Sequence, residues 1–204
     1  MSDFVCRDCG TTFSLPQSVL DRYPGWTPKQ CRDCRDVPGG GSRSSSSGNH
    51  VANDSLAKDP TTGVFTDGSS SPNPGPGGWG AVYVVDDKIV EEACGHGGDT
   101  TNNRMELLAL IKAVDLVPEG TDATVYSDSN LAVRTITEWA AEWEKRGWKR
   151  KTGPVENLDL VKQAYAAFTK RPELELMWIK AHVGFRWNEY ADELANRGRV
   201  EGHG

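Results

Sequence analysis

The chain has 204 residues, of which 25% are charged, and a net charge of −6, so it is long enough for one sizeable domain with a small appendage. It has no long apolar run and no secretory type of leader, so we expect a cytoplasmic protein with no membrane partner. The negative charge argues against a diffusely basic nucleic-acid coat, although it permits a local basic patch.

Four of the five cysteines lie near the start of the chain in two Cys-x-x-Cys pairs, Cys6 with Cys9 and Cys31 with Cys34. Two such pairs, separated here by residues 10–30, are typical of a structural Zn²⁺ site with four thiolate ligands. Disulfides or a redox motif are the alternatives, and the lack of an export signal and of a βαβ pattern disfavours both. We predict a zinc-binding module over residues 1–37 in which the metal supplies much of the folding free energy, because the module holds too few apolar side chains for an unaided core.

Residues 38–61 are rich in glycine and serine and predict a flexible linker. The pattern changes at residue 62, where short apolar runs begin to alternate with turn signals. The first run predicts a strand at 63–67, and the proline- and glycine-dense stretch that follows, 71–78, predicts a tight loop.

Two further strands are expected at 79–85 and 88–96, joined as a hairpin through Asp86 and Asp87. The remaining elements are predicted in chain order as a helix near 103–117, a strand at 122–127, a helix from about 130, a helix near 158–169, a strand near 174–179 and a helix near 187–198. This order predicts an α/β fold over residues 62–200, with a mixed five-stranded sheet and helices on both faces. The fifth cysteine, Cys94, falls in a strand and is expected to be a small buried hydrophobic residue.

Four carboxylates stand at positions that the fold alone does not explain. Asp67 and Asp128 each end an apolar strand, Glu106 opens a helical run on the same stripe as Leu110, and Asp192 lies in the last helix. A carboxylate at the end of an apolar strand costs free energy unless a cation neutralises it. Ligation by oxygen alone suits Mg²⁺ or Mn²⁺, so the four acids predict a divalent metal site.

The catalytic part of the chain resembles a known family, type 1 ribonuclease H (ribonuclease HI), over about residues 62–198. Each matching string is weak by itself, but all of them occur in the family's order. The strings are Phe65-Thr66-Asp67-Gly68-Ser69, Asn73-Pro74-Gly75-Pro76-Gly77-Gly78, Thr100-Thr101-Asn102-Asn103-Arg104-Met105-Glu106-Leu107, Ser127-Asp128-Ser129, Lys145-Arg146-Gly147-Trp148 and Asn188-Glu189-Tyr190-Ala191-Asp192-Glu193-Leu194-Ala195.

The resemblance implies a ribonuclease H-like fold and an endoribonuclease that hydrolyses the RNA strand of RNA–DNA hybrids, leaving 5′-phosphate and 3′-hydroxyl ends. It implies that Asp67, Glu106, Asp128 and Asp192 hold two Mg²⁺ (or Mn²⁺) ions, an arrangement that fits two-metal phosphodiester chemistry. His182, ten residues before Asp192 as in the family, is implied to assist proton transfer or product release. A monomer is expected.

The resemblance also implies a set of substrate contacts. Asn73, Asn102 and Asn130 match positions that read the minor groove of the hybrid, where 2′-hydroxyls are displayed. Residues 139–151 resemble the family's basic protrusion, in which cations meet phosphates and indole rings pack along sugars; its contacts here are expected from Trp139, Trp143 and Lys149. Thr101 and Asn157 match a phosphate pocket, but Asp99 stands where bacterial members often have arginine. This departure predicts a weaker phosphate grip and stronger dependence on salt and metal unless another cation compensates.

Two other functions are considered for the catalytic part: a different nuclease or transferase on the same fold, such as an integrase or junction resolvase, and a hybrid-binding protein without activity. The basic protrusion and the string over residues 100–107 argue against the first, and the intact carboxylate set argues against the second. The cysteine module resembles a zinc ribbon, and residues 1–63 carry seven basic and seven acidic side chains. Their balance leaves open whether the module tethers nucleic acid or docks a protein.

Overall fold

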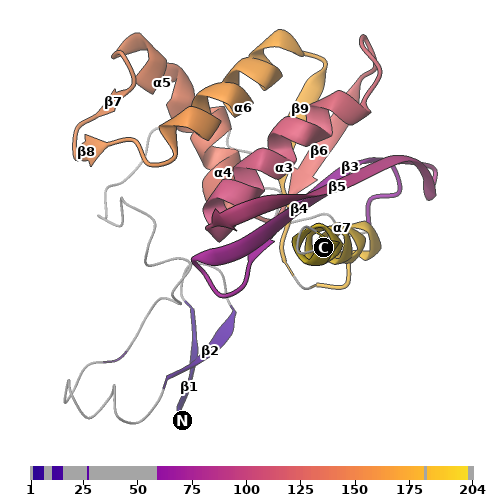
Figure 1. The fold of residues 1–204 in the computed structure, drawn as a ribbon, viewed down its shortest axis with the longest axis horizontal. Helices are drawn as coiled ribbons and strands as arrows, with labels where there is room; N and C mark the ends of the chain where they lie inside the picture. Colours follow the sequence, from indigo (N-terminus) through magenta and orange to yellow (C-terminus); the bar gives the residue numbers. More distant parts are fainter. Residues whose placement is uncertain (1, 7–10, 16–26, 28–58, 182, 202–204) are drawn as a thin grey trace. The chain divides into compact units, whose positions relative to one another are not determined.

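The computed structural model describes residues 2–6, 11–15, 27, 59–181 and 183–201, and the chain forms two compact units, Met1–His50 and Val51–Gly204. In the first unit, β1 (Ser2–Val5) and β2 (Thr12–Leu15) form an antiparallel hairpin (Figure 1). Cys6 directly follows β1 and is almost fully buried. The other predicted zinc ligands, Cys9, Cys31 and Cys34, and most of the predicted linker lie outside the described residues.

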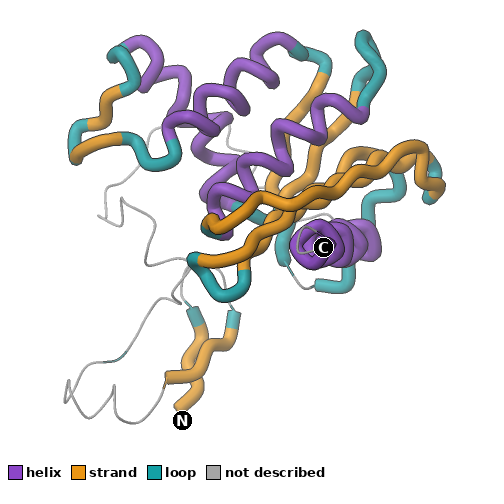
Figure 2. Tube along the Cα trace, viewed as in Figure 1, coloured by secondary structure: helices purple, strands orange, loops and turns teal. Residues whose placement is uncertain are grey.

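The second unit is built on a five-stranded sheet with the order β5-β4-β3-β6-β9. Strands are orange in Figure 2. Strands β3, β4 and β5 pair antiparallel, whereas β6 and β9 continue the sheet in parallel. The mixed five-stranded prediction is therefore confirmed. The strands are β3 (Gly63–Ser70), β4 (Gly75–Val85), β5 (Lys88–Thr100), β6 (Ala123–Ser127) and β9 (Leu174–Trp178).

The predicted loop at 71–78 is too long, because β4 already begins at Gly75. Glycines continue the hairpin ladder here, with Ser70 opposite Gly77 and Gly75 opposite Thr100. Gly77 lies so close to Thr100 and Met105 that a side chain would collide with both. Glycine at this point serves close packing between strand and helix, whereas the sequence pattern alone indicates a turn.

Helices cover both faces of the sheet, as predicted (Figure 1). Of the described helices, α7 (Arg186–Glu201) is the one that packs on one face, against β3, β4 and β5. The other face carries α3 (Asn102–Leu116) and α6 (Leu158–Lys170), with a continuous helical segment made of α4 (Asn130–Arg134), the π-helical turn η1 (Thr135–Trp139) and α5 (Ala140–Lys145). A short hairpin of β7 (Lys149–Arg150) and β8 (Gly153–Pro154) follows α5.

Successive side chains of β3 point to opposite faces, so both of its faces are core. Val64 belongs to the apolar cluster under α3 and α6, and Phe65 belongs to the cluster under α7. The next polar residue, Thr66, is fully buried and donates from Oγ1 to the Tyr126 carbonyl oxygen at 3.0 Å. The strand therefore delivers its following acid, Asp67, into an interior that disfavours charge. None of the described helices is long and apolar enough to cross a membrane.

Candidate active site

Asp67 and Asp128 occupy matching positions on neighbouring parallel strands. The pairing of β3 with β6 runs from Val64 opposite Val125 to Thr66 opposite Ser127, and the two acids are the next residues on each chain segment. The prediction that Asp67 ends its strand is wrong, because β3 continues to Ser70 through its pairing with β4. The pairing of β3 with β6 stops just before Asp67, and Asp67 and Asp128 are the first residues beyond its last pair. Their carboxylates therefore lie side by side.

Glu106 reaches the same point from the second turn of α3. A close approach of α3 to β3 makes this possible, because Gly68 has no side chain and a Cβ there would collide with the backbone of Met105 and Glu106. The Glu106 side chain keeps some exposure overall, but its Oε2 atom is buried and has no hydrogen-bond partner among the described residues. A buried carboxylate oxygen without a donor is a costly arrangement that a cation would relieve.

Asp128 is held by residues that the sequence analysis did not single out. Asn188, on α7, is 5% exposed and donates from Nδ2 to Asp128 Oδ2 at 3.0 Å. Trp178, the last residue of β9, donates from Nε1 to the Asp128 carbonyl oxygen at 3.1 Å. The one available signal for Asn188 is its spacing: it precedes Asp192 by four residues, so both lie on one face of α7.

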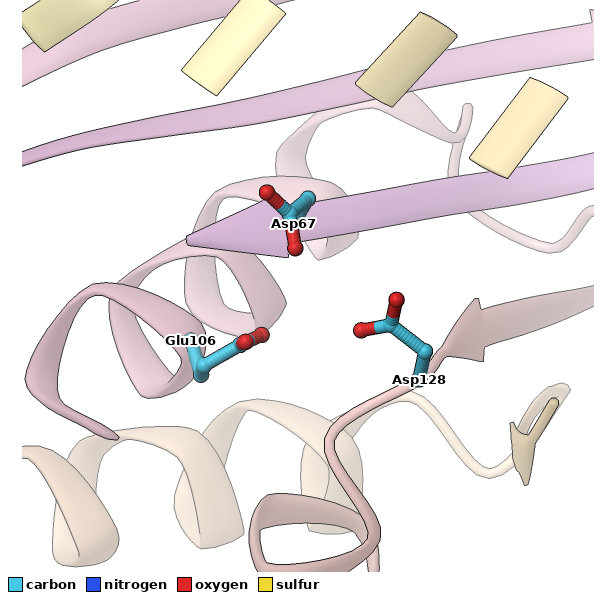
Figure 3. A group of neighbouring side chains, drawn as sticks. All are labelled: Asp67, Glu106 and Asp128. Atoms are coloured by element: carbon cyan, nitrogen blue, oxygen red, sulfur yellow. The ribbon is translucent and has the colours of Figure 1, made fainter. Parts of the chain in front are cut away.

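The carboxylates of Asp67, Glu106 and Asp128 lie together, with one oxygen of each within 4.8 Å of the others (Figure 3). Asp192 is exposed and stands outside this trio. Its negative charge nevertheless raises the pKa of both Asp67 and Glu106, so it lies near them. The Asp192 Oδ1 atom accepts a hydrogen bond from Asn196 Nδ2 at 3.1 Å, one turn further along α7.

The trio is electrostatically strained without a cation. Burial, followed by the charges of Asp128 and Asp192, raises the pKa of Asp67 to about 7. Burial is again the largest cause for Glu106, and together with the charges of Asp67, Asp128 and Asp192 it raises the pKa of Glu106 well above its usual value. Oxygen-only ligands, like charges in close proximity and a buried carboxylate oxygen without a donor together fit a divalent ion of the Mg²⁺ or Mn²⁺ type.

Of the predicted substrate contacts, Asn73 and Asn102 come together. Asn73 lies in the loop between β3 and β4, and its Oδ1 accepts from the Asn102 backbone N–H at 3.3 Å. Asn130 is exposed at the start of α4, where its backbone N–H donates to the Asp128 carbonyl oxygen at 3.0 Å. His182 lies outside the described residues.

The two predicted phosphate-pocket residues stand at helix starts. Thr101 precedes α3, and Asn157 precedes α6 in a left-handed conformation. Arg104 links these two helices, because its Nη1 donates to Asn157 Oδ1 at 3.4 Å and its guanidinium forms an ion pair with Asp159 at 2.7 Å. The cation that is hydrogen-bonded to Asn157 is thus already paired with a carboxylate. Asp99 is exposed.

The tryptophans of the basic protrusion contact each other, a cation and the apolar core. The rings of Trp139 and Trp143 lie 5.9 Å apart, and the Arg134 guanidinium stacks 4.9 Å above Trp139. Trp143 and Trp148 both pack against the apolar core. Lys149 is exposed. The predicted contact residues of the protrusion thus include partly buried indole rings and an exposed cation.

Several cations of the protrusion are paired with carboxylates. Glu142 accepts from Lys145 at 3.0 Å and from Arg146 at 3.4 Å, and Arg150 lies 3.3 Å from Glu156. Both partners of the Glu142 pairs are exposed, so these ion pairs contribute little to stability and exchange readily. Because Glu142 and Glu156 offset some of these cations, the net positive charge of the protrusion is smaller than the number of its lysines and arginines indicates.

The sheet order, the helices on both faces and the acidic trio beside two adjacent parallel strands define an α/β protein with a candidate divalent-metal site. A family model described as RNase H matches residues 59–200. The chain therefore belongs to the ribonuclease H family.

Individual relatives agree with this assignment. The chain is 43% identical over 145 residues to a ribonuclease H of Hahella chejuensis, with 71% of this chain and 97% of that protein covered. It is 44% identical over 140 residues to a ribonuclease H of Methylorubrum extorquens, with 68% of this chain covered but only 60% of that longer protein. Among solved structures, LC11-RNase H1 in complex with an RNA/DNA hybrid matches with a TM-score of 0.54 and 25% identity, covering 69% of this chain and 98% of that one.

Proposed function

We propose that this chain is an endoribonuclease that hydrolyses the RNA strand of RNA–DNA hybrids and leaves 5′-phosphate and 3′-hydroxyl ends. The observation that carries the proposal is the acidic trio, whose oxygens approach within 4.8 Å. The relatives named ribonuclease H, and the matching structure with a bound hybrid, support the substrate class.

Asp67, Glu106 and Asp128 are proposed as the principal ligands of two Mg²⁺ or Mn²⁺ ions, with Asp192 completing the set. When bound, the ions lower the pKa of a water nucleophile and offset negative charge at the scissile phosphate. Asn188 keeps the Asp128 carboxylate in one orientation through its 3.0 Å hydrogen bond. The raised pKa values of Asp67 and Glu106 mean that ion binding displaces protons from these carboxyls.

The remaining substrate roles are proposed from the resemblance, with structural support for some. Asn73, Asn102 and Asn130 read the minor groove, and the proximity of the first two supports a shared contact. Thr101 and Asn157, at the starts of two helices, bind a backbone phosphate through donors that favour anions. The protrusion residues Trp139, Trp143 and Lys149 hold the DNA strand. His182, ten residues before Asp192, assists proton transfer or product release.

We also propose that residues 1–37 form a zinc ribbon with Cys6, Cys9, Cys31 and Cys34 as ligands, joined by the linker 38–61 to the catalytic domain 62–200. Support comes from the β1–β2 hairpin, which flanks the first Cys-x-x-Cys pair, and from the burial of Cys6. Metal analysis of the full chain tests this: about one Zn²⁺ per chain is expected, and Cys31→Ser with Cys34→Ser should abolish it.

The test of the catalytic proposal compares the full chain with Asp128→Asn in Mg²⁺ on RNA–DNA, RNA–RNA and DNA–DNA duplexes. The parent should cut only the RNA strand of the hybrid, and Asp128→Asn should lose cleavage while still binding it. Asp115→Asn, the same change at an exposed position of α3, is the matched control and should cut normally. Comparable cutting of DNA–DNA, or turnover by Asp128→Asn, would contradict the assignment.

A further inference from the structure

A buried hydroxyl joins the two proposed minor-groove asparagines. Ser70, the last residue of β3, is 8% exposed. Its Oγ lies 3.0 Å from Asn102 Oδ1 and 3.2 Å from Asn73 Oδ1, and its backbone N–H donates to Asn102 Oδ1 at 2.7 Å. The Asn102 backbone N–H in turn lies 3.3 Å from Asn73 Oδ1. The cluster ties the end of β3, the β3–β4 loop and the start of α3 together.

The chemistry of this cluster fixes the orientation of both amides. A backbone N–H can only donate, so the atom that faces it must be an oxygen. Ser70 N–H therefore fixes Oδ1 of Asn102, and Asn102 N–H fixes Oδ1 of Asn73. With both oxygens turned into the cluster, each NH₂ group points elsewhere, and neither has a hydrogen-bond partner among the described residues.

The hydroxyl proton is shared between two acceptors. A serine hydroxyl has one proton, so Oγ can donate to Asn102 or to Asn73 at any moment, but not to both. Asn102 has the additional 2.7 Å bond from Ser70 N–H, whereas Asn73 is otherwise held only by the long 3.3 Å bond. The hydroxyl consequently contributes most to the orientation of Asn73.

We propose that Ser70 is a positioning residue that presets the amides of Asn73 and Asn102 as N–H donors, and that it thereby sets the preference for ribose over deoxyribose. The proposal rests on the proposed function, because it takes 2′-hydroxyl oxygens of the RNA strand as the acceptors of these donors. A site with preset donors penalises a sugar that lacks the oxygen, since the donors are then left unpaired. Loosely held amides could turn away and would lose this discrimination.

The alternative is that Ser70 only stabilises the β3–β4 hairpin. A purely structural hydroxyl would lower the melting temperature when removed, and would affect hybrid and 2′-deoxy-substituted hybrid alike. Ser70→Ala removes the hydroxyl but keeps the backbone donor, so it isolates the shared bond. Ser70→Cys keeps a weak donor of similar size and serves as the conservative variant. Ser71→Ala, one residue further at an exposed position, is the matched control.

The experiment measures kcat and KM of the full chain on one hybrid, and on hybrids with single 2′-deoxy substitutions on either side of the cut. Ser70→Ala should raise KM about three- to tenfold with kcat nearly unchanged. The 2′-deoxy penalty of the parent should shrink by a similar factor at one or more positions, with Ser70→Cys between the two and Ser71→Ala like the parent.

Two results would overturn the proposal, and they are distinguishable. If the parent cuts hybrids with a 2′-deoxy penalty and Ser70→Ala leaves that penalty unchanged, the positioning role is wrong and the proposed function stands. If the parent neither cuts nor binds the hybrid in preference to a DNA duplex, the proposed function falls and the Ser70 role falls with it. Should Ser70→Ala fail to fold, the same comparison with Ser70→Cys decides.

Discussion

Asn188 Nδ2 donates to Asp128 Oδ2 at 3.0 Å, which ties α7 to the residue that follows β6. Asn188 is nearly fully buried, so the bond is shielded from water. Groups that orient metal-binding carboxylates typically affect metal affinity or activity by 10- to 100-fold. The catalytic geometry thus depends on a residue that carries no charge.

Replacing Asn188 by alanine should therefore impair metal use. We expect Asn188→Ala to lower the apparent Mg²⁺ affinity and kcat by about tenfold or more, because the Asp128 carboxylate loses its orienting donor. Mg²⁺ titrations of hybrid cleavage measure the effect. Gln163→Ala, on the exposed side of α6, should behave like the parent. An unchanged Mg²⁺ midpoint in Asn188→Ala would show that Asp128 needs no orienting partner.

The metal-free protein should lose stability as pH rises. The folded-state pKa of Asp67 is about 7, above its ordinary value of 3.8. A raised pKa contributes stability that is fully present below about pH 4 and is lost as pH rises through 7. Melting in EDTA should accordingly occur at lower temperature at pH 8 than at pH 5, and the free energy of unfolding should differ by a few kcal/mol at most between the two.

Two comparisons assign this pH effect to the acidic site. Asp67→Asn should flatten the difference between pH 5 and pH 8, because the amide cannot ionise. Mg²⁺ should raise the melting temperature of the parent more at pH 8 than at pH 5, since fewer protons then compete with it. Equal effects of Mg²⁺ at both pH values would contradict the assigned pKa shifts.

The order of the elements and the mixed sheet could be predicted because the apolar runs are clear and the strands alternate with helices. The four acids are recognisable from their positions next to apolar strand and helix patterns and from the family strings. The strand register could not be predicted. Asp67 and Asp128 follow the last residue pair of β3 and β6, and this depends on pairing between segments about 60 residues apart. Ser70 and Asn188 were missed for a related reason, since their partners lie 32 and 60 residues away.

Arg171 is expected to be a stability residue. Its side chain is only 14% exposed, and its guanidinium donates to the carbonyl oxygens of Val114 at 3.3 Å and Val117 at 3.1 Å, where α3 ends. Arg171→Ala should destabilise the protein by about 1–3 kcal/mol, because it removes the donor to these carbonyls and breaks the ion pair with Glu173. Urea unfolding measures this, and kcat well below the melting temperature should stay unchanged. Lys170→Ala, at the neighbouring exposed position, should have little effect.

Glu142 should weaken hybrid binding. Glu142 forms ion pairs with Lys145 and Arg146, which are both exposed. Both cations lie in the protrusion that is proposed to contact the DNA strand. Glu142→Gln should tighten hybrid binding and steepen its salt dependence by up to about one unit in log–log slope, because the freed cations can meet phosphates. Binding of the Asp128→Asn protein to hybrid at several salt concentrations measures both effects, with Glu119→Gln as an exposed control. An unchanged slope would place Lys145 and Arg146 outside the contact.

Asp99 offers a direct test of the phosphate pocket. It is exposed and lies two residues before Thr101, and the nearby Arg104 is committed to Asp159 through a 2.7 Å ion pair. Arg104 donates a hydrogen bond to Asn157, and among the described residues no other cation is bonded to Asn157. Asp99→Arg should strengthen hybrid binding, since it exchanges a repulsive charge for a phosphate partner.

The size and position of this gain distinguish a pocket from general charge. Asp99→Asn removes only the repulsion and should produce a smaller gain, whereas Asp122→Arg, the same reversal at another exposed site, should produce little. Binding to a hybrid in which one methylphosphonate replaces a DNA-strand phosphate locates the contact: the gain from Asp99→Arg should vanish at one position only. A gain that is equal for Asp122→Arg, or insensitive to every such replacement, would mean that Thr101 and Asn157 do not form a phosphate pocket.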